Sequence, residues 1–322
     1  MTRSDRSNDT ADSPGTPRRS RRRLLIPLAA VAGVLLAPLP LAAGVVVGSS
    51  EPEAELESVL LADEPLGGGE QLAVAVTPEA AASEAGKPTP TSDPEPADPV
   101  PPQVIERSES GRPEVAITLD ADLSEWTRDK VRAGTLPPQV NWEVLDYLES
   151  SGTKSTVFVT GLWAQEYPDA MTRMAGNPLY ELANHSWDHD AWTYDCYGLP
   201  VMNGDPVEEV TATSSLIAEY TGAWPRYFRF PGLCHDADDV ALVASTGAAT
   251  VDYDLDGSDA FAENPQSVAN ALAAQASAGS IVVLHLNGVP NAPVTAQILQ
   301  ALVPALEAKG LTPVTMSELM AE

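Results

Sequence analysis

Residues 114–122 of the chain read EVAITLDAD. Apolar and β-branched side chains fill most of this stretch, as is typical of a buried strand, and the carboxylates of Asp120 and Asp122 come where the strand should end. Apolar runs followed by polar side chains recur along the rest of the chain. We expect seven strands, at residues 115–119, 155–160, 180–184, 227–229, 248–252, 281–284 and 312–315.

Helical patterns lie between most of these strands, at residues 142–149, 207–220, 267–276 and 294–309. Helices that alternate with strands let each strand start from the same edge of a sheet, so the strands run parallel. Seven such strands favour an α/β fold in which a parallel sheet curls into a barrel. The active site of such a barrel lies at the carboxyl ends of its strands.

Composition separates a linker from a folded domain. No aromatic, histidine or cysteine residue precedes Trp126, and residues 51–112 hold 14 Asp or Glu, three Lys or Arg and ten Pro. Such a segment buries too little apolar surface to offset the entropy lost on folding, so we interpret it as a disordered acidic linker. Residues 113–322 hold every aromatic side chain and should form one folded domain.

The N-terminus has the order of an export signal. Residues 1–23 carry seven Arg against three Asp and should be a cytoplasmic n-region, whereas residues 24–50 are uncharged. This order is typical of a signal peptide or a membrane anchor, and the run SRRRLL at residues 20–25 resembles a twin-arginine signal. Cleavage of the segment is left open. The domain should lie outside the cytoplasm, either secreted or membrane-anchored.

The expected folded domain is strongly acidic, with eight Lys or Arg and 29 Asp or Glu, a net charge of −21. This charge repels phosphate backbones, so we expect no nucleic-acid partner and favour neutral or cationic polymers. We expect the protein to be a monomer.

Cys196 and Cys234 are the only cysteines in the chain. An oxidising compartment would let them pair, and closing a loop of about 38 residues would stabilise the fold by roughly 4 kcal/mol. Two separate buried thiols are an alternative. A metal site that includes the neighbouring His235 is another.

Polar groups suited to catalysis follow most of the expected strands. Besides the two aspartates, His185 and His189 follow the third strand and Arg229 ends the fourth. Asp259 comes after the fifth strand, and His285 directly follows the sixth. The chain has only four histidines, and packing alone explains poorly why three of them come after strands beside carboxylates. A shared active site accounts for this placement.

The strings that hold these residues resemble a known family. They are TLDAD at 118–122, HSWDH at 185–189, FRFPG at 228–232, DAF at 259–261 and LH at 284–285. In this order and spacing they resemble the five motifs of the NodB-type polysaccharide deacetylases, carbohydrate esterase family 4. The resemblance covers residues 115–318. It implies a distorted (β/α)7 barrel, one divalent metal ion, usually zinc, and removal of acetyl groups from amino sugars or xylan.

A metal site can be assembled from the first two strings. Two imidazoles four residues apart and a carboxylate can hold zinc and leave one position open for water. We therefore expect His185, His189 and Asp122 to be the metal ligands. The resemblance implies that Asp120 is the base that takes a proton from the attacking water.

One residue departs from the family pattern. The family usually has two adjacent aspartates, first the base and then a metal ligand, and Ala121 stands at the second position here. Asp122 must reach the metal instead, from the same side of an extended chain as Asp120. Exchanged roles of the two aspartates, or a two-histidine site completed by water, remain alternatives.

The other strings supply the remaining catalytic groups. By resemblance, Arg229 orients the base, and its charge would lower the pKa of that base. We expect His285 to protonate the leaving nitrogen, with its pKa raised by Asp259. Gly232 should let a backbone N–H approach the negative charge that develops on the acetyl oxygen, although the family often has Tyr at this position.

Together these features predict an enzyme, a hydrolase that removes acetyl groups from a polysaccharide. N-acetyl groups of peptidoglycan are favoured because an exported domain on a long linker meets the cell wall first, and ester bonds remain open. One alternative is a carbohydrate-binding or wall-associated domain without catalysis. Another is a metal-dependent amidase that acts on a non-sugar amide.

Overall fold

The computed structural model describes residues 97–321. The predicted n-region, the predicted signal segment and residues 51–96 of the expected linker lie outside the described residues, so those assignments stay predictions. Across residues 97–321, the structure contains no helix with the length and apolar character needed to cross a membrane.

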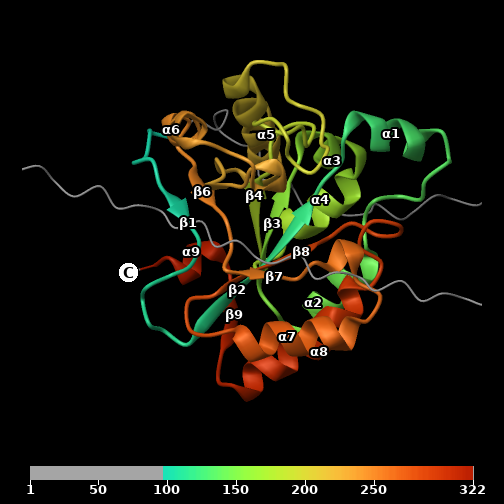
Figure 1. Ribbon diagram of the computed structural model, residues 1–322, viewed down its shortest axis with the longest axis vertical. Coiled ribbons are helices and arrows are strands. Elements are labelled where there is room, and N and C mark those ends of the chain that lie inside the picture. The colour runs from blue at the N-terminus through green and yellow to red at the C-terminus, as the bar shows by residue number, and fades with distance from the viewer. Residues whose placement is uncertain (1–96, 322) are drawn as a thin grey trace, which may run out of the picture. The chain divides into compact units, whose positions relative to one another are not determined.

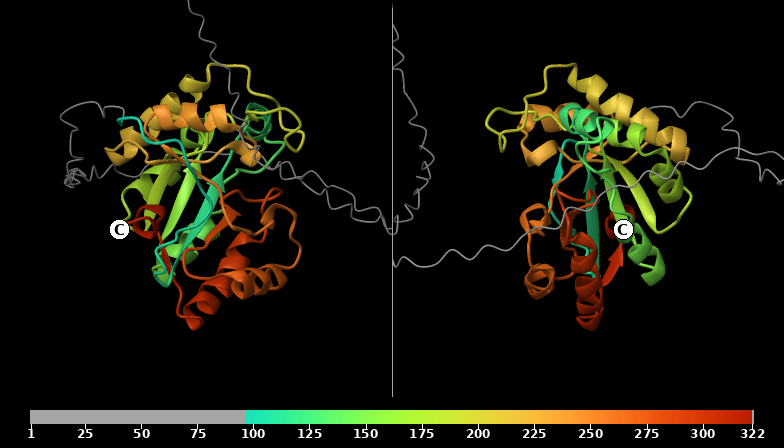
Figure 2. Two further views of the ribbon diagram at one scale, coloured as in Figure 1. Left: turned by 60° about the vertical axis from the view of Figure 1, so that its left-hand side comes forward. Right: turned by 90° about the vertical axis from the view of Figure 1, so that its right-hand side faces the viewer.

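The centre of the domain is a parallel sheet that curls into an open half-barrel (Figures 1 and 2). Its strands are β1 (Val104–Ile105), β2 (Glu114–Ala121), β3 (Ser155–Val159), β4 (Tyr180–Asn184), β5 (Tyr227–Phe228), β6 (Ala249–Val251), β7 (Leu255–Asp256), β8 (Ile281–His285) and β9 (Thr312–Val314). Their order across the sheet is β1-β6-β5-β4-β3-β2-β8-β7, and β9 pairs with the first residues of β2.

The structure confirms the predicted fold class, a distorted (β/α)7 barrel, and contains all seven predicted strands. They are β2, β3, β4, β5, β6, β8 and β9. The two unexpected strands, β1 and β7, are two residues long, which is too short to produce a recognisable apolar repeat.

Helices flank the sheet and connect its strands (Figure 2). They are α1 (Glu125–Arg132), α2 (Trp142–Ser151), α3 (Gly161–Glu166), α4 (Pro168–Ala175), α5 (Pro206–Thr221), α6 (Ala237–Ser245), α7 (Pro265–Gln275), α8 (Thr295–Ala308) and α9 (Met316–Leu319). Two short 3-10 helices, η1 (Pro231–Leu233) and η2 (Asp259–Phe261), follow β5 and β7. Helices α7 and α8 pack side by side, as Figure 1 shows in orange and red.

The ends of α5 illustrate how the sequence sets these helices. Asp205 precedes the helix and accepts a hydrogen bond from the N–H of Val207, while Pro206 occupies the first turn, where no N–H is needed. Gly222 ends the helix with a φ of 75°, a left-handed conformation that glycine adopts without strain.

Alternation along β2 separates the packed core from the site. Val115, Ile117 and Leu119 pack in the main apolar cluster, which includes residues of α2, α7 and α8. Ala116 faces the opposite way, into a smaller cluster built from most of the strands. Because side chains alternate along a strand, Asp120 lies on the same face of β2 as Ala116. The strand therefore carries this carboxylate into the hollow of the half-barrel.

The folded domain begins earlier than the sequence predicted. Residues 97–112 were assigned to the linker, but Val104 and Ile105 form β1, which pairs with β6, and the N–H of Val100 donates to the carbonyl of Ala244. Ile105 is buried. A two-residue strand among prolines and charged residues carries almost no periodic signal, so sequence reasoning placed the boundary too late.

Candidate active site

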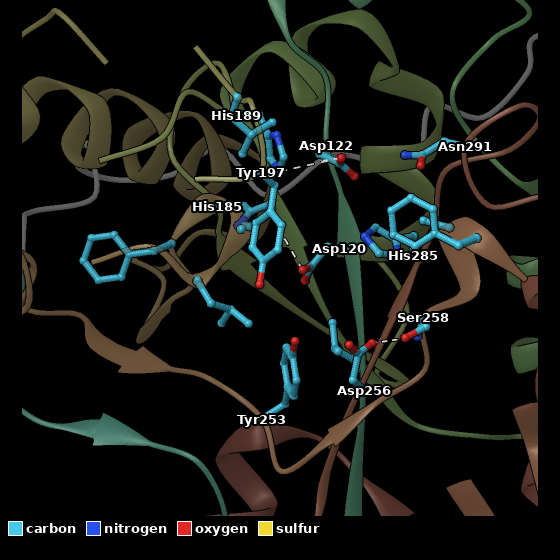
Figure 3. A pocket seen from close by; sticks show the side chains of 17 residues that line it. Asp120, Asp122, His185, His189, Tyr197, Tyr253, Asp256, Ser258, His285 and Asn291 are labelled. Carbon is cyan, nitrogen blue, oxygen red and sulfur yellow. Dashed lines mark hydrogen bonds and ion pairs between the residues drawn. The ribbon is translucent and has the colours of Figure 1, made fainter. Parts of the chain in front are cut away.

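The carboxyl ends of the central strands surround a cleft of about 400 Å³ (Figure 3). The predicted site residues that line this cleft are Asp120, Asp122, His185, His189, Gly232 and His285. Arg229 and Asp259 lie behind this lining and are fully buried. The structure thus brings together the groups that follow β2, β4, β5, β7 and β8.

Asp120 is held by a buried arginine. Nη1 of Arg229 donates to Oδ1 of Asp120 at 2.7 Å and to Oγ1 of Thr118 at 2.9 Å. The other nitrogens of the guanidinium donate to the backbone carbonyls of Val251 and Asp252. Burial alone would raise the pKa of Asp120, but the charge of Arg229, with smaller contributions from nearby histidines, lowers that pKa below its usual value. Asp120 is therefore ionised at neutral pH, as a proton acceptor must be.

His185 directly follows β4 and is buried. Its Nδ1 lies 2.8 Å from the carbonyl oxygen of Arg229, so this nitrogen carries the proton and donates it. Nε2 then presents a lone pair on the side of Asp120, whose Oδ2 is 3.7 Å away. Burial lowers the pKa of His185 to about 4. A neutral imidazole is the form that binds a metal ion.

A turn after β4 brings His189 back beside His185. Oδ1 of Asn184 accepts from the N–H of Ser186, and its Nδ2 donates to the carbonyl of Val210 on α5. Ser186 and His189 both have positive φ values, 68° and 64°, and the two imidazole centroids lie 5.0 Å apart. Sequence reasoning missed Asn184, although asparagine at the end of a strand is a known turn signal.

Asp122 lies beside His189, as Figure 3 shows. Its Oδ2 is 3.6 Å from Nε2 of His189, while its Oδ1 is buried without a hydrogen-bond partner in the described part of the chain. The amide of Asn287 holds the Asp122 backbone, accepting from its N–H at 3.1 Å and donating to its carbonyl at 2.7 Å. Sequence reasoning missed Asn287 because a single asparagine in a loop has no pattern.

His285 faces the cleft from the end of β8 and is paired with Asp259. Its Nδ1 lies 2.7 Å from Oδ1 of Asp259, and its backbone N–H donates to Oδ2. Burial alone would lower the pKa of His285, but the hydrogen bond and charge of Asp259 raise it to about 10. Oγ1 of Thr295 also donates to Asp259. His285 is therefore protonated at neutral pH and can donate a proton.

The predicted disulfide between Cys196 and Cys234 is confirmed, with the two Cα atoms 5.9 Å apart. Gly232, in η1, has a φ of 61°, and a Cβ on it would lie 2.6 Å from Sγ of Cys196. The disulfide therefore gives a structural reason for glycine at this position. A role of its N–H in stabilising negative charge stays a prediction.

Comparisons with known proteins point to one family. The polysaccharide deacetylase family model matches residues 107–251. A chitin deacetylase from Pestalotiopsis sp. is 26% identical over 182 residues, covering 54% of this chain and 57% of that protein. A chitooligosaccharide deacetylase from Bradyrhizobium sp. (strain ANU 289) is 27% identical over 179 residues, covering 52% of this chain and 78% of that protein.

The crystal structure of a peptidoglycan N-acetylglucosamine deacetylase shares the fold, with a TM-score of 0.56 at 19% identity over 67% of this chain and 92% of that one. Over residues 107–251 the chain is similar to the polysaccharide deacetylase family, in agreement with the resemblance to the NodB-type deacetylases of carbohydrate esterase family 4. It spans little more than half the length of the chitin deacetylase that it resembles.

The family match ends at β6, so it includes only part of the site. Asp259 and His285 lie beyond residue 251, and their place in the candidate site rests on geometry alone. They lie on the cleft side opposite His185, as Figure 3 shows for His285. Ala121, where the chain departs from the family pattern, points into the main apolar cluster. Its face of β2 is therefore packed, and Asp122 is the next carboxylate on the cleft side.

The donors present fit the divalent metal ion that the family implies. Within residues 97–321, no group of three or more His, Cys, Asp or Glu side chains forms a complete metal site as it stands. However, two ligands of one tetrahedral zinc ion lie about 3.3 Å apart, close to the 3.6 Å between Asp122 Oδ2 and His189 Nε2. The unpartnered Oδ1 of Asp122 and the neutral His185 add two further donors. The chemistry of these donors therefore suits one divalent cation.

Proposed function

We propose that this protein is an exported, metal-dependent hydrolase that removes N-acetyl groups from the amino sugars of a polysaccharide, with peptidoglycan as the favoured substrate. The observation that carries the proposal is the placement of an ionised carboxylate, Asp120, and a protonated imidazole, His285, on neighbouring strands across one cleft. The two residues are register partners on β2 and β8. Amide hydrolysis needs such a pair, one group to accept a proton and the other to donate one.

Asp120 is the proposed base. Its Oδ1 is occupied by Arg229 at 2.7 Å, which leaves Oδ2 to accept a proton from a water molecule in the cleft. The bound arginine fixes the orientation of the carboxylate and keeps it ionised. Water that loses its proton to Asp120 can attack the carbonyl carbon of an acetyl group.

His285 is the proposed acid. Breaking the C–N bond requires a proton on the leaving nitrogen, and the products are then acetate and a free amine. The hydrogen bond from Nδ1 to Asp259 leaves Nε2–H to donate this proton. Asp259 keeps the imidazole charged before the step and fixes the plane of its ring.

The metal ion would be held by Asp122, His185 and His189, and zinc is the candidate because nitrogen and oxygen donors in this number suit it. When bound, the cation would supply a more acidic water molecule and polarise the acetyl carbonyl.

The substrate proposal rests on the predicted export of the domain. The predicted signal segment and the Cys196–Cys234 disulfide both favour a location outside the cytoplasm. The wall is the first polymer that an exported domain meets. Related proteins include chitin and chitooligosaccharide deacetylases, so chitin oligomers are the main competing substrate.

Acetate release tests the proposal. The purified protein should release acetate from peptidoglycan and from chitin oligomers, lose this activity with a chelator and regain it with zinc. Acetylxylan serves as the ester comparison. Sugar binding without acetate release would favour a non-catalytic carbohydrate-binding domain, and activity confined to small amides would favour a non-sugar amidase.

A further inference from the structure

The loop between the proposed ligands His185 and His189 has an unusual backbone conformation. Ser186 and His189 have φ values of 68° and 64°, in the left-handed region that residues other than glycine rarely adopt. Such residues keep this conformation only where surrounding contacts fix it. The two imidazoles can serve one metal ion only while this backbone keeps its shape, so the contacts of the loop bear on how well the ion is bound.

The backbone groups of Ser186 and Trp187 are all hydrogen-bonded. The carbonyl of Ser186 accepts from the N–H of Gly161 at 3.0 Å and from Oγ1 of Thr213 at 2.9 Å. The carbonyl of Trp187 accepts from the N–H of Leu162 at 2.9 Å. The N–H of Ser186 donates to the asparagine that ends β4. One group remains, the N–H of Trp187, and its partner is a charged side chain.

Glu209, in the first turn of α5, is this partner. Its Oε2 accepts from the N–H of Trp187 at 3.0 Å. Within residues 97–321 this is the only hydrogen bond of the Glu209 side chain, and no cation pairs with it there. Thr213 lies one helical turn further along α5, so both side chains reach the loop from the same face of the helix.

The ring of Trp187 fixes the loop against a second helix. A Cβ on Gly161, the first residue of α3, would lie 2.1 Å from Cε3 of this ring. Glycine is therefore needed at that position for the ring to lie where it does. The loop between the histidines is thus held by α3 and α5 together.

The fold itself gains little from a carboxylate at position 209. The side chain of Glu209 is half-buried, and burial, together with the charge of nearby Asp188, raises its pKa to about 7. A carboxyl group with a raised pKa disfavours folding once it ionises. The exposed Glu208 beside it can meet the positive end of α5 without this cost, so helix stability does not explain Glu209.

We propose that Glu209 is a positioning residue for the metal ion, which fixes the backbone between His185 and His189 before the ion binds. Its hydrogen bond to Trp187 helps to hold the loop in the shape that sets the two imidazole centroids 5.0 Å apart. Without this bond the loop can leave that shape, and the ion must restore it on binding, which lowers the affinity. The inference rests on the proposed metal site and adds to it a residue outside the ligand set.

The zinc affinity of the full-length protein tests this role and needs no turnover. It is measured by competition with a chromophoric chelator. Glu209→Leu and Glu209→Ala both remove the acceptor, and each should raise the dissociation constant for zinc by about 10–100-fold, the usual effect of losing a group that orients metal ligands. Glu209→Gln keeps an oxygen that can accept from the same N–H, so it should restore most of the affinity.

Glu208→Leu is the matched control. Glu208 lies in the same turn of α5, is exposed, and makes no side-chain hydrogen bond in the described part of the chain, so this change should leave zinc affinity as it is in the parent. Co²⁺ in place of zinc gives a second measurement, because its visible absorption changes with ligand geometry. The absorption bands should change in Glu209→Leu and stay unchanged in Glu209→Gln and Glu208→Leu. Circular dichroism that matches the parent shows that the variants compared are folded.

The outcomes separate the role of Glu209 from the proposed activity. Unchanged zinc affinity in Glu209→Leu, equal losses in Glu209→Leu and Glu208→Leu, or a loss in Glu209→Gln as large as that in Glu209→Leu would overturn the positioning role. The expected pattern of zinc affinities in a protein that releases no acetate would support this role and refute the activity. A parent protein that binds no zinc would overturn both.

Discussion

Replacing Arg229 with Met removes the charge that holds Asp120 while keeping a long, flexible side chain in its place. The guanidinium is fully buried and donates to Asp120, to Thr118 and to two backbone carbonyls. Methionine cannot make these bonds, so the variant leaves the Asp120 carboxylate without its counter-charge.

The expected loss of stability at pH 7 is about 3 kcal/mol. Removing one partner of a buried ion pair costs about 3–5 kcal/mol, and Asp120 can relieve part of this cost by taking up a proton. The lowered pKa of Asp120 means that its contribution to stability is present above the unfolded pKa, about 3.9, and is lost as pH falls through the folded pKa. The difference between parent and variant should therefore shrink in acid.

Urea unfolding at pH 7 and in acid measures the loss of stability. The pH profile of kcat/KM measures the change in the pKa of Asp120. In Arg229→Met the acidic limb of this profile should move to higher pH, because the pKa of Asp120 rises when the positive charge is gone. Arg226→Met is the control, since Arg226 is exposed and three residues away, and its stability should change by no more than about 0.5 kcal/mol. Equal unfolding of the two variants, with an unmoved acidic limb, would refute this account of Asp120.

Three further predictions concern the other parts of the site. His189→Ala should lose most of the zinc bound by the parent protein, measured by elemental analysis, because few protein ligands are present; full zinc retention would remove His189 from the ligand set. Asp259→Asn should lower the pKa of His285 from about 10, so the alkaline limb of kcat/KM should move to lower pH, and an unmoved limb would contradict the pairing. Removing the disulfide with Cys196→Ala should lower the free energy of unfolding in urea by about 4 kcal/mol, because the bond joins residues 38 apart in sequence. A change below about 1 kcal/mol would show that other contacts hold the loop.

The sequence was most informative where apolar runs are long. The runs around Val157 and Val283 produce β3 and β8 within one residue of the expected bounds, because four or more consecutive apolar or β-branched residues between helical patterns leave few alternatives. β1 was missed because Val104 and Ile105 gain their order from pairing with β6, a contact distant in sequence.

For the site, the sequence indicated which residues gather, because the carboxyl ends of parallel strands meet. It did not indicate how they are held. The amide of Asn287 fixes the Asp122 backbone and the amide of Asn184 shapes the histidine turn, and neither hydrogen-bond pattern follows from the sequence around it.

The most direct test of the central claim compares Asp120→Asn with Asp122→Asn, with zinc content and acetate release measured together over a zinc titration. Asparagine keeps the size of the side chain and removes its charge. Asp120→Asn should keep its zinc and lose about 10²–10⁴ in kcat at every zinc concentration, since a missing proton acceptor is not restored by metal. Asp122→Asn should bind zinc more weakly and recover part of its activity as zinc is raised, because mass action refills a weakened site. Zinc rescue of Asp120→Asn instead of Asp122→Asn, or full zinc content and activity in Asp122→Asn, would contradict the assigned roles.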